Sequence, residues 1–144
     1  RATEELTVAL KEQIDQGLIE VEQRDGKVFV TVGSGGAFPS GTADLTGEAQ
    51  RIMDRIALTA MSPDSSITVT GHTDDVPISN GQFRDNWDLG AGRAASVVQA
   101  IQNTGLISGD RLSAVSKGEM APLADNNTAA GREQNRRIEI EISY

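Results

Sequence analysis

Two periodicities of apolar and polar residues run along this chain and predict its elements. Alternation with period two predicts strands over residues 18–23, 27–32, 67–71 and 136–143, and a weaker apolar stretch predicts another over 111–116. Apolar residues at steps of three and four predict helices over 2–16, 46–61 and 89–103. This succession predicts an α/β two-layer sandwich, a mixed sheet with helices on one face.

Turn-forming residues separate the predicted elements. Asp25-Gly26 predicts a tight hairpin between the first two strands. Residues 34–45, 76–85 and 119–131 are rich in Gly, Pro, Ser and Asn and predict loops, the last with a single helical turn near Thr128. Within the first of these loops, we expect Phe38 to pack against the core.

The first predicted helix has a narrow apolar stripe made of Leu6, Leu10 and Ile14, and Gly17 is placed to end it. Because the chain opens at Arg1 inside this pattern and without Met, we expect it to be part of a longer protein. Residues 1–17 are interpreted as a linker helix from a missing membrane anchor, or as a plain capping helix. Residues 18–144 are expected to form the main domain.

Composition excludes some classes of function. The 144 residues include 21 acidic and 13 basic side chains, a net charge of −8, which disfavours nucleic acid as a partner. With no cysteine, disulfides and thiol chemistry are absent. No apolar run approaches the ~18 residues of a membrane helix.

Arg93 is the most informative candidate residue. It lies four residues after Leu89 and four before Val97, so it shares the apolar side of its helix. A buried guanidinium cannot lose its charge and needs a partner. Asp74 follows the end of a strand, where clefts form in such sheets. An acid and a base held side by side there would complement an amino acid with a free ammonium and a free carboxylate.

Two other interpretations of these residues stay open. Asp74 and Arg93 can simply neutralise each other inside a structural domain. Alternatively, His72, Asp74 and Asp75 can form the metal site of a hydrolase, although no further histidine or cysteine exists to complete a ligand set. Against the metal site, His72 is expected to be a hydrogen-bonding residue that shapes the loop.

Three motifs resemble the OmpA-like peptidoglycan-binding domain: GHTDD at 71–75, NWDLGAGRA at 86–94 and NRRIEI at 135–140. They occur in the family's order, and the resemblance extends from about Lys27 to the C-terminus. Pro77 and the Asn86-Trp87 pair resemble the MotB and PomB branch, the flagellar stator subunits. Gly90 stands where the family usually has Ser, which would loosen the first helical turn because Gly costs about 1 kcal/mol relative to Ala.

The resemblance implies non-catalytic binding of the diaminopimelate-containing stem peptide of the cell wall, with no cofactor and no metal. By motif position, Asp74 would take the ammonium and Arg93 the carboxylate. Asn86 and Thr73 would line the same pocket, and Arg136 would balance Asp74 or touch the ligand.

The same resemblance implies a cellular setting. The chain would be the periplasmic domain of a bacterial inner-membrane protein, a stator subunit that pairs with a MotA- or PomA-type channel subunit through its missing N-terminal part and forms a homodimer. The alternative within the superfamily is an outer-membrane lipoprotein or porin-type wall anchor, which would bind the same ligand.

Overall fold

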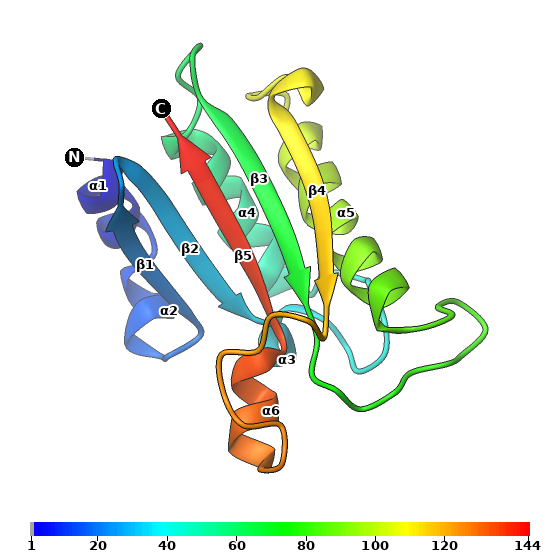
Figure 1. The fold of residues 1–144 in the computed structure, drawn as a ribbon. Helices are drawn as coiled ribbons and strands as arrows, with labels where there is room; N and C mark the ends of the chain where they lie inside the picture. Colours follow the sequence, from blue (N-terminus) through cyan, green and yellow to red (C-terminus); the bar gives the residue numbers. More distant parts are fainter. Residues whose placement is uncertain (1) are drawn as a thin grey trace.

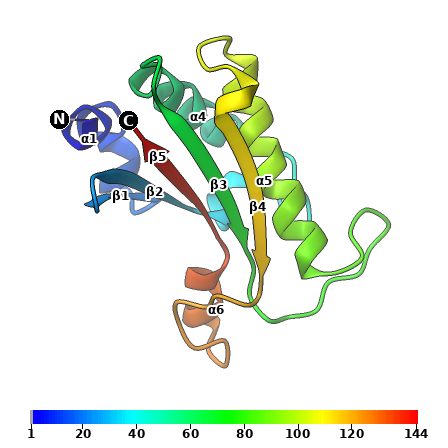
Figure 2. The ribbon, with the colours of Figure 1, turned by 45° about the horizontal axis from the view of Figure 1, so that its top comes forward.

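The computed structural model describes residues 2–144, which form a five-stranded sheet with the long helices packed on one face (Figures 1 and 2). The strand order is β1-β2-β5-β3-β4; β3 and β4 pair in parallel and all other neighbours are antiparallel. The strands are β1 (Ile19–Arg24), β2 (Lys27–Gly33), β3 (Ser66–His72), β4 (Leu112–Gly118) and β5 (Arg137–Ser143). The predicted two-layer sandwich with a mixed sheet is confirmed.

The helices follow the predicted periodicity with local differences. They are α1 (Ala2–Ala9), α2 (Lys11–Asp15), α3 (Ser34–Ala37), α4 (Gly47–Thr59), α5 (Asn86–Asn103) and α6 (Ala129–Asn135), with a short 3₁₀ turn at Gly109–Arg111. The single helix predicted over 2–16 is broken at Leu10, and Gly17 ends it at φ 76°. Thr46 caps α4, since its hydroxyl accepts a hydrogen bond from the Ala49 amide at 3.2 Å.

The core lies between the sheet and the helices. The isoleucines of β5 are fully buried against the apolar stripe of α4 and α5. Leu6 and Leu10 are also fully buried in this core, so α1 packs on the domain itself. Within residues 2–144, no helix combines the length and the apolarity that a membrane crossing requires.

Two predicted loops contain helices, and the last strand starts one residue later than predicted. Thr128 caps α6 by accepting from the Gly131 amide at 2.9 Å, and the helix continues through Asn135. Arg136 is therefore the C-terminal cap of α6 and not the first residue of the strand, and its side chain faces the helix side of the sheet, as the isoleucines of β5 do. Because α6 is polar and has no apolar stripe, periodicity could not reveal it. The other helix, α3, is a single turn inside the loop predicted over 34–45.

Arg137 lies on the open face of the sheet but is only 3% exposed. The segment after β4 folds over it, and Arg137 Nη2 donates to the Ala121 carbonyl at 3.0 Å while Nε pairs with Glu139 at 2.6 Å. Asn135 fixes the same segment by accepting from the Leu123 amide at 2.7 Å.

β3 and α5 approach each other very closely at two glycines. A Cβ atom on Gly71 would lie 2.1 Å from the Gly90 carbonyl oxygen, and one on Gly90 would lie 2.5 Å from the Ser116 hydroxyl. That hydroxyl donates to the Trp87 carbonyl at 2.8 Å, so it supports the first turn of α5 beside Gly90. Glycine at this position therefore permits the close approach of strand and helix.

Gly71→Ala should destabilise the protein by about 2–3 kcal/mol, because the added methyl meets backbone that cannot move without separating β3 from α5. Gly81→Ala is the matched control, since nothing lies within 4 Å of its added Cβ, and it should change stability by no more than about 0.5 kcal/mol. Urea denaturation measures both. Equal stability of the two variants would contradict the close packing of these glycines.

Stability should fall steeply in acid because of Glu139. His72 at 3.5 Å and Arg137 at 2.6 Å lower the pKa of Glu139 from 4.5 to about 2, against the opposing effect of burial. A carboxyl group whose pKa is depressed by folding contributes stability above its unfolded pKa and loses it as pH falls through the folded value. Between pH 4.5 and 2 the native protein should therefore lose stability more steeply than Glu139→Gln. Glu141→Gln, on the same strand face, is the control and should keep the native slope.

Candidate functional site

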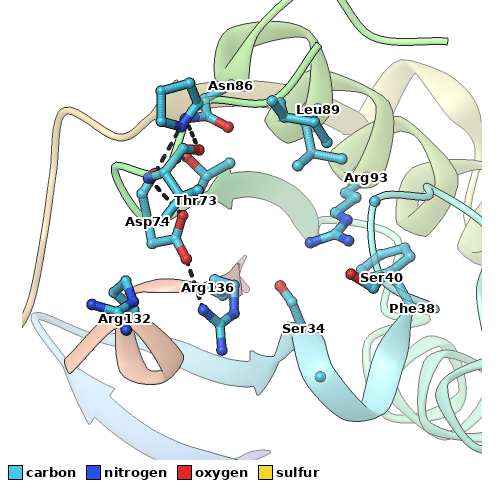
Figure 3. A pocket seen from close by; sticks show the side chains of 15 residues that line it. Ser34, Phe38, Ser40, Thr73, Asp74, Asn86, Leu89, Arg93, Arg132 and Arg136 are labelled. Carbon is cyan, nitrogen blue, oxygen red and sulfur yellow. Dashed lines mark hydrogen bonds and ion pairs between the residues drawn. The ribbon is translucent and has the colours of Figure 1, made fainter. Parts of the chain in front are cut away.

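A cavity of about 600 Å³ opens where β3 ends, between the start of α5, the α3 turn and α6 (Figure 3). It brings together segments that are far apart in the sequence. Every residue predicted for the ligand site lines it: Thr73, Asp74, Asn86, Arg93 and Arg136.

Asp74 forms one wall of the cavity and is held in place by its own loop. The Thr73 amide donates to the Gly118 carbonyl at 2.9 Å, which extends the pairing of β3 and β4 by one residue. Beyond it, Asp74 Oδ1 accepts from the Val76 amide at 3.0 Å, and Oδ2 pairs with Arg136 Nη1 at 2.7 Å. The carboxylate is therefore fixed before any ligand arrives.

Asn86 is the first residue of α5 and ties that helix to the Asp74 loop. Asp85 caps the helix, and the side-chain Nδ2 of Asn86 donates to the backbone carbonyls of Asp74 and Val76 at 3.3 and 3.1 Å. Asn86 Oδ1 is buried and has no hydrogen-bond partner among residues 2–144. An unsatisfied acceptor of this kind costs free energy in the empty site.

Arg93 lies on the other side of the cavity and is 5% exposed. Its Nε donates to the Thr42 carbonyl at 2.7 Å, and its guanidinium carbon lies 4.8 Å from the centre of the Phe38 ring. In Figure 3 its terminal nitrogens point into the cavity. Phe38 is buried as expected, and it also supports this guanidinium.

Arg93 has no carboxylate within 4.0 Å in the described part of the chain, because Asp74 is paired with Arg136. Asp74 and Arg93 line one cavity but do not pair with each other, which contradicts the alternative that they neutralise each other inside the fold: Figure 3 shows them on different walls of the cavity. Burial, and then the nearby charge of Arg136, lower the pKa of Arg93 to about 10, and Asp74 only partly opposes this. Arg93 still carries its charge at neutral pH.

Two further lining residues were missed from the sequence. Ser34, on α3, is 2% exposed, and its hydroxyl has no partner among residues 2–144. No periodicity marks it. Arg132 also lines the cavity and donates to the Asn126 carbonyl at 2.9 Å. Its spacing of four residues from Arg136 would have revealed it if α6 had been recognised. The lining thus holds three arginines and one carboxylate, in a chain of net charge −8.

The residues of the alternative metal site do not converge. His72 projects from the open face of the sheet toward Glu139, whereas Asp74 faces the cavity on the helix side. Within residues 2–144 no group of three or more His, Asp or Glu side chains is placed to hold a metal ion. The geometry gives no support to the hydrolase interpretation.

Comparison with known proteins shows that the region around the cavity matches a known family. The OmpA family model matches residues 37–136, which is most of the chain and includes all five predicted site residues. The chain belongs to the OmpA family. The likeness predicted from the three motifs, including that to the MotB branch, is confirmed by the relatives described next.

Motility protein B of Bacillus subtilis is 32% identical over 125 residues, 86% of this chain and 48% of that protein. The cell wall anchor of the T6SS from Pseudomonas aeruginosa superposes with a TM-score of 0.88 at 31% identity, covering 96% of each chain. A putative MotB-like protein from Desulfovibrio vulgaris gives 0.87 at 28% identity, covering 99% of this chain and 91% of that one. The chain spans about half the length of the motility protein.

Replacing Arg93 should separate a structural from a functional role. Arg93→Met should change the free energy of unfolding by no more than about 1 kcal/mol, because the lost Thr42 hydrogen bond is offset by removal of a buried charge that has no carboxylate. Arg137→Met is the matched control, a buried arginine with a carboxylate partner, and it should cost about 3 kcal/mol or more. Urea denaturation of both variants decides. Equal losses would favour mutual neutralisation within the fold.

Proposed function

We propose that this domain binds peptidoglycan through the cavity between Asp74 and Arg93 and so anchors a membrane complex to the cell wall. The observation that carries the proposal is a buried Arg93 whose charge no described carboxylate neutralises, facing the cavity in which Asp74 is already fixed. A ligand carboxylate would neutralise the Arg93 guanidinium and accept charge-assisted hydrogen bonds from it.

The ligand chemistry is that of a free amino acid end. Each oxygen of Asp74 accepts one hydrogen bond from the protein, which leaves lone pairs for a ligand ammonium. The unpartnered Asn86 Oδ1 is a second acceptor, and the Ser34 hydroxyl is a donor for a carboxylate beside Arg93. Diaminopimelate in a stem peptide presents an ammonium and a carboxylate on one carbon, whereas a lysine side chain presents the ammonium alone.

We propose binding without catalysis. Among the described lining residues Asp74 is the single carboxylate, and both of its oxygens already accept a hydrogen bond, from Arg136 and from the Val76 amide. Thr73, Asp74, Asn86, Arg93 and Arg136 are the proposed ligand residues, and Ser34 joins them.

The stator of a flagellar motor is the complex that we propose for the full-length protein. The similarity to motility protein B of Bacillus subtilis supports it. In this proposal the domain is periplasmic, α1 leads from an inner-membrane anchor, a second copy completes a dimer, and a MotA-type channel subunit binds the part upstream. The likeness to a T6SS cell wall anchor favours a second candidate with the same ligand and a different machine. An acidic residue inside an upstream apolar segment would favour the stator.

Sedimentation with purified peptidoglycan sacculi tests the ligand. Arg93→Met and Asp74→Asn should each weaken binding at least about tenfold, the size of a lost charge-assisted contact. Arg51→Met and Asp54→Asn on the exposed side of α4 carry the same changes away from the cavity and should bind like the native protein. Native affinity in both cavity variants would refute the proposal.

Competition tests the finer specificity. Free meso-diaminopimelate should displace the domain from sacculi. Nα-acetyl-L-lysine amide, whose blocked α groups leave an ammonium without a carboxylate, should do so at least about tenfold less well. If the two compounds compete equally well, the domain can still bind the wall, but Arg93 does not recognise the diaminopimelate carboxylate.

A further inference from the structure

A second cavity, of about 500 Å³, lies on the opposite face of the sheet, beneath the segment that follows β4. Its walls are side chains of the strand ends and the apolar residues 121–123 of the covering segment. Arg137 and Asn135 hold this segment in place through backbone hydrogen bonds, so the cavity has a fixed roof. The residues of the proposed peptidoglycan site do not line it.

Positive charge gathers in this cavity although the chain as a whole is acidic. Arg24, Lys117 and Arg137 line it together with one carboxylate, Glu139. Glu139 is already paired with Arg137 at 2.6 Å, and Arg24 is paired with Glu22 outside the lining. Lys117 is exposed and makes no side-chain hydrogen bond or ion pair within residues 2–144, so its ammonium is available to a ligand. Among the described lining residues Lys117 is therefore the cation without a carboxylate partner.

His72 contributes a second, independent sign of a ligand. It is 5% exposed, and neither ring nitrogen has a hydrogen-bond partner within the described residues. Its Nε2 contacts Glu139 Oε1 at 3.5 Å, longer than the roughly 2.7–3.2 Å of a good N–H···O hydrogen bond. A buried polar group without a partner costs free energy that a bound group can recover.

We propose that this cavity binds an oxyanion of the cell envelope, a carboxylate or a phosphate, with Lys117 supplying charge and Thr70 and His72 supplying hydrogen bonds. A carboxylate or phosphate accepts hydrogen bonds from all of these groups. The wall as the source of the anion rests on the proposed function. Arg136 and Arg137 are consecutive and face the two cavities, so one wall polymer that passes around this end of the sheet can occupy both.

The single histidine of the chain makes the test specific. With ¹⁵N-labelled histidine, inorganic phosphate is titrated at constant pH and ionic strength, and the imidazole signals of His72 are followed by NMR. The native protein should show a saturable shift, and Lys117→Gln should weaken phosphate binding at least about tenfold. Lys27→Gln, on the same face but paired with Glu141 outside the cavity, should respond like the native protein.

A shift that does not saturate, or equal affinity in native and Lys117→Gln protein, would overturn the proposal. Arg93→Met should keep the His72 response while losing sacculus binding, so that failure here is distinct from failure of the proposed peptidoglycan site.

Sacculi with and without hydrofluoric acid treatment, which removes phosphodiester-linked polymers, identify the source. Weaker binding of Lys117→Gln to both preparations assigns murein carboxylates, and weaker binding to untreated sacculi alone assigns polymer phosphates. No loss on either preparation would overturn a wall anion as the occupant.

Discussion

The cavity of this domain is organised around a buried positive charge that has no carboxylate partner among the described residues. Arg93 is buried because it lies on the apolar side of α5, and the acid that could neutralise it, Asp74, is paired with Arg136 instead. Stacking on Phe38 and one hydrogen bond to the Thr42 carbonyl stabilise the guanidinium only in part. The terminal nitrogens of the guanidinium point into the cavity (Figure 3), where no described carboxylate pairs with them. This arrangement costs stability in the free protein, and in the proposed function a ligand carboxylate would offset that cost, as in many sites where function is favoured over stability.

In the proposed function, the pairing of Asp74 with Arg136 serves recognition as well as stability. It fixes the orientation of the carboxylate, so a ligand ammonium would meet a preorganised acceptor. It also keeps the two opposite charges of the site apart. If Asp74 instead paired with Arg93, each would satisfy the other and a zwitterionic ligand would have to break the pair before binding. By pairing with Asp74, Arg136 therefore leaves Arg93 available to a ligand carboxylate and Asp74 correctly oriented for a ligand ammonium.

Strand and helix patterns were predictable because burial on one face imposes a period on the sequence. The five strands and the long helices α4 and α5 follow this rule, and the motif positions brought the five site residues to one cavity. Only the start of helix α6 was predicted, as a turn near Thr128, because the helix is short, polar and held by its Thr128 cap and by tertiary contacts. The pairing of Arg136 with Asp74 was predictable, since Arg136 shares the parity of the β5 isoleucines, which face the helix side of the sheet. Ser34 carries no pattern, since only the fold shows that its hydroxyl lacks a partner.

The NRRIEI motif shows how consecutive residues can perform unrelated tasks at the junction of a helix and a strand. Asn135 ends α6 and fastens the segment that follows β4, Arg136 caps the helix and fixes Asp74, and Arg137 opens β5 on the other face of the sheet. Because the backbone changes from helical to extended at Arg136, two adjacent arginines face opposite sides of the sheet. Lysine in place of either arginine would keep the charge but lose the planar array of donors. Arg137 in particular uses all three of its nitrogens, on Glu139 and on two carbonyls. The motif therefore requires arginine twice for different reasons: on one face to orient a carboxylate for a ligand, and on the other to hold a covering segment in place.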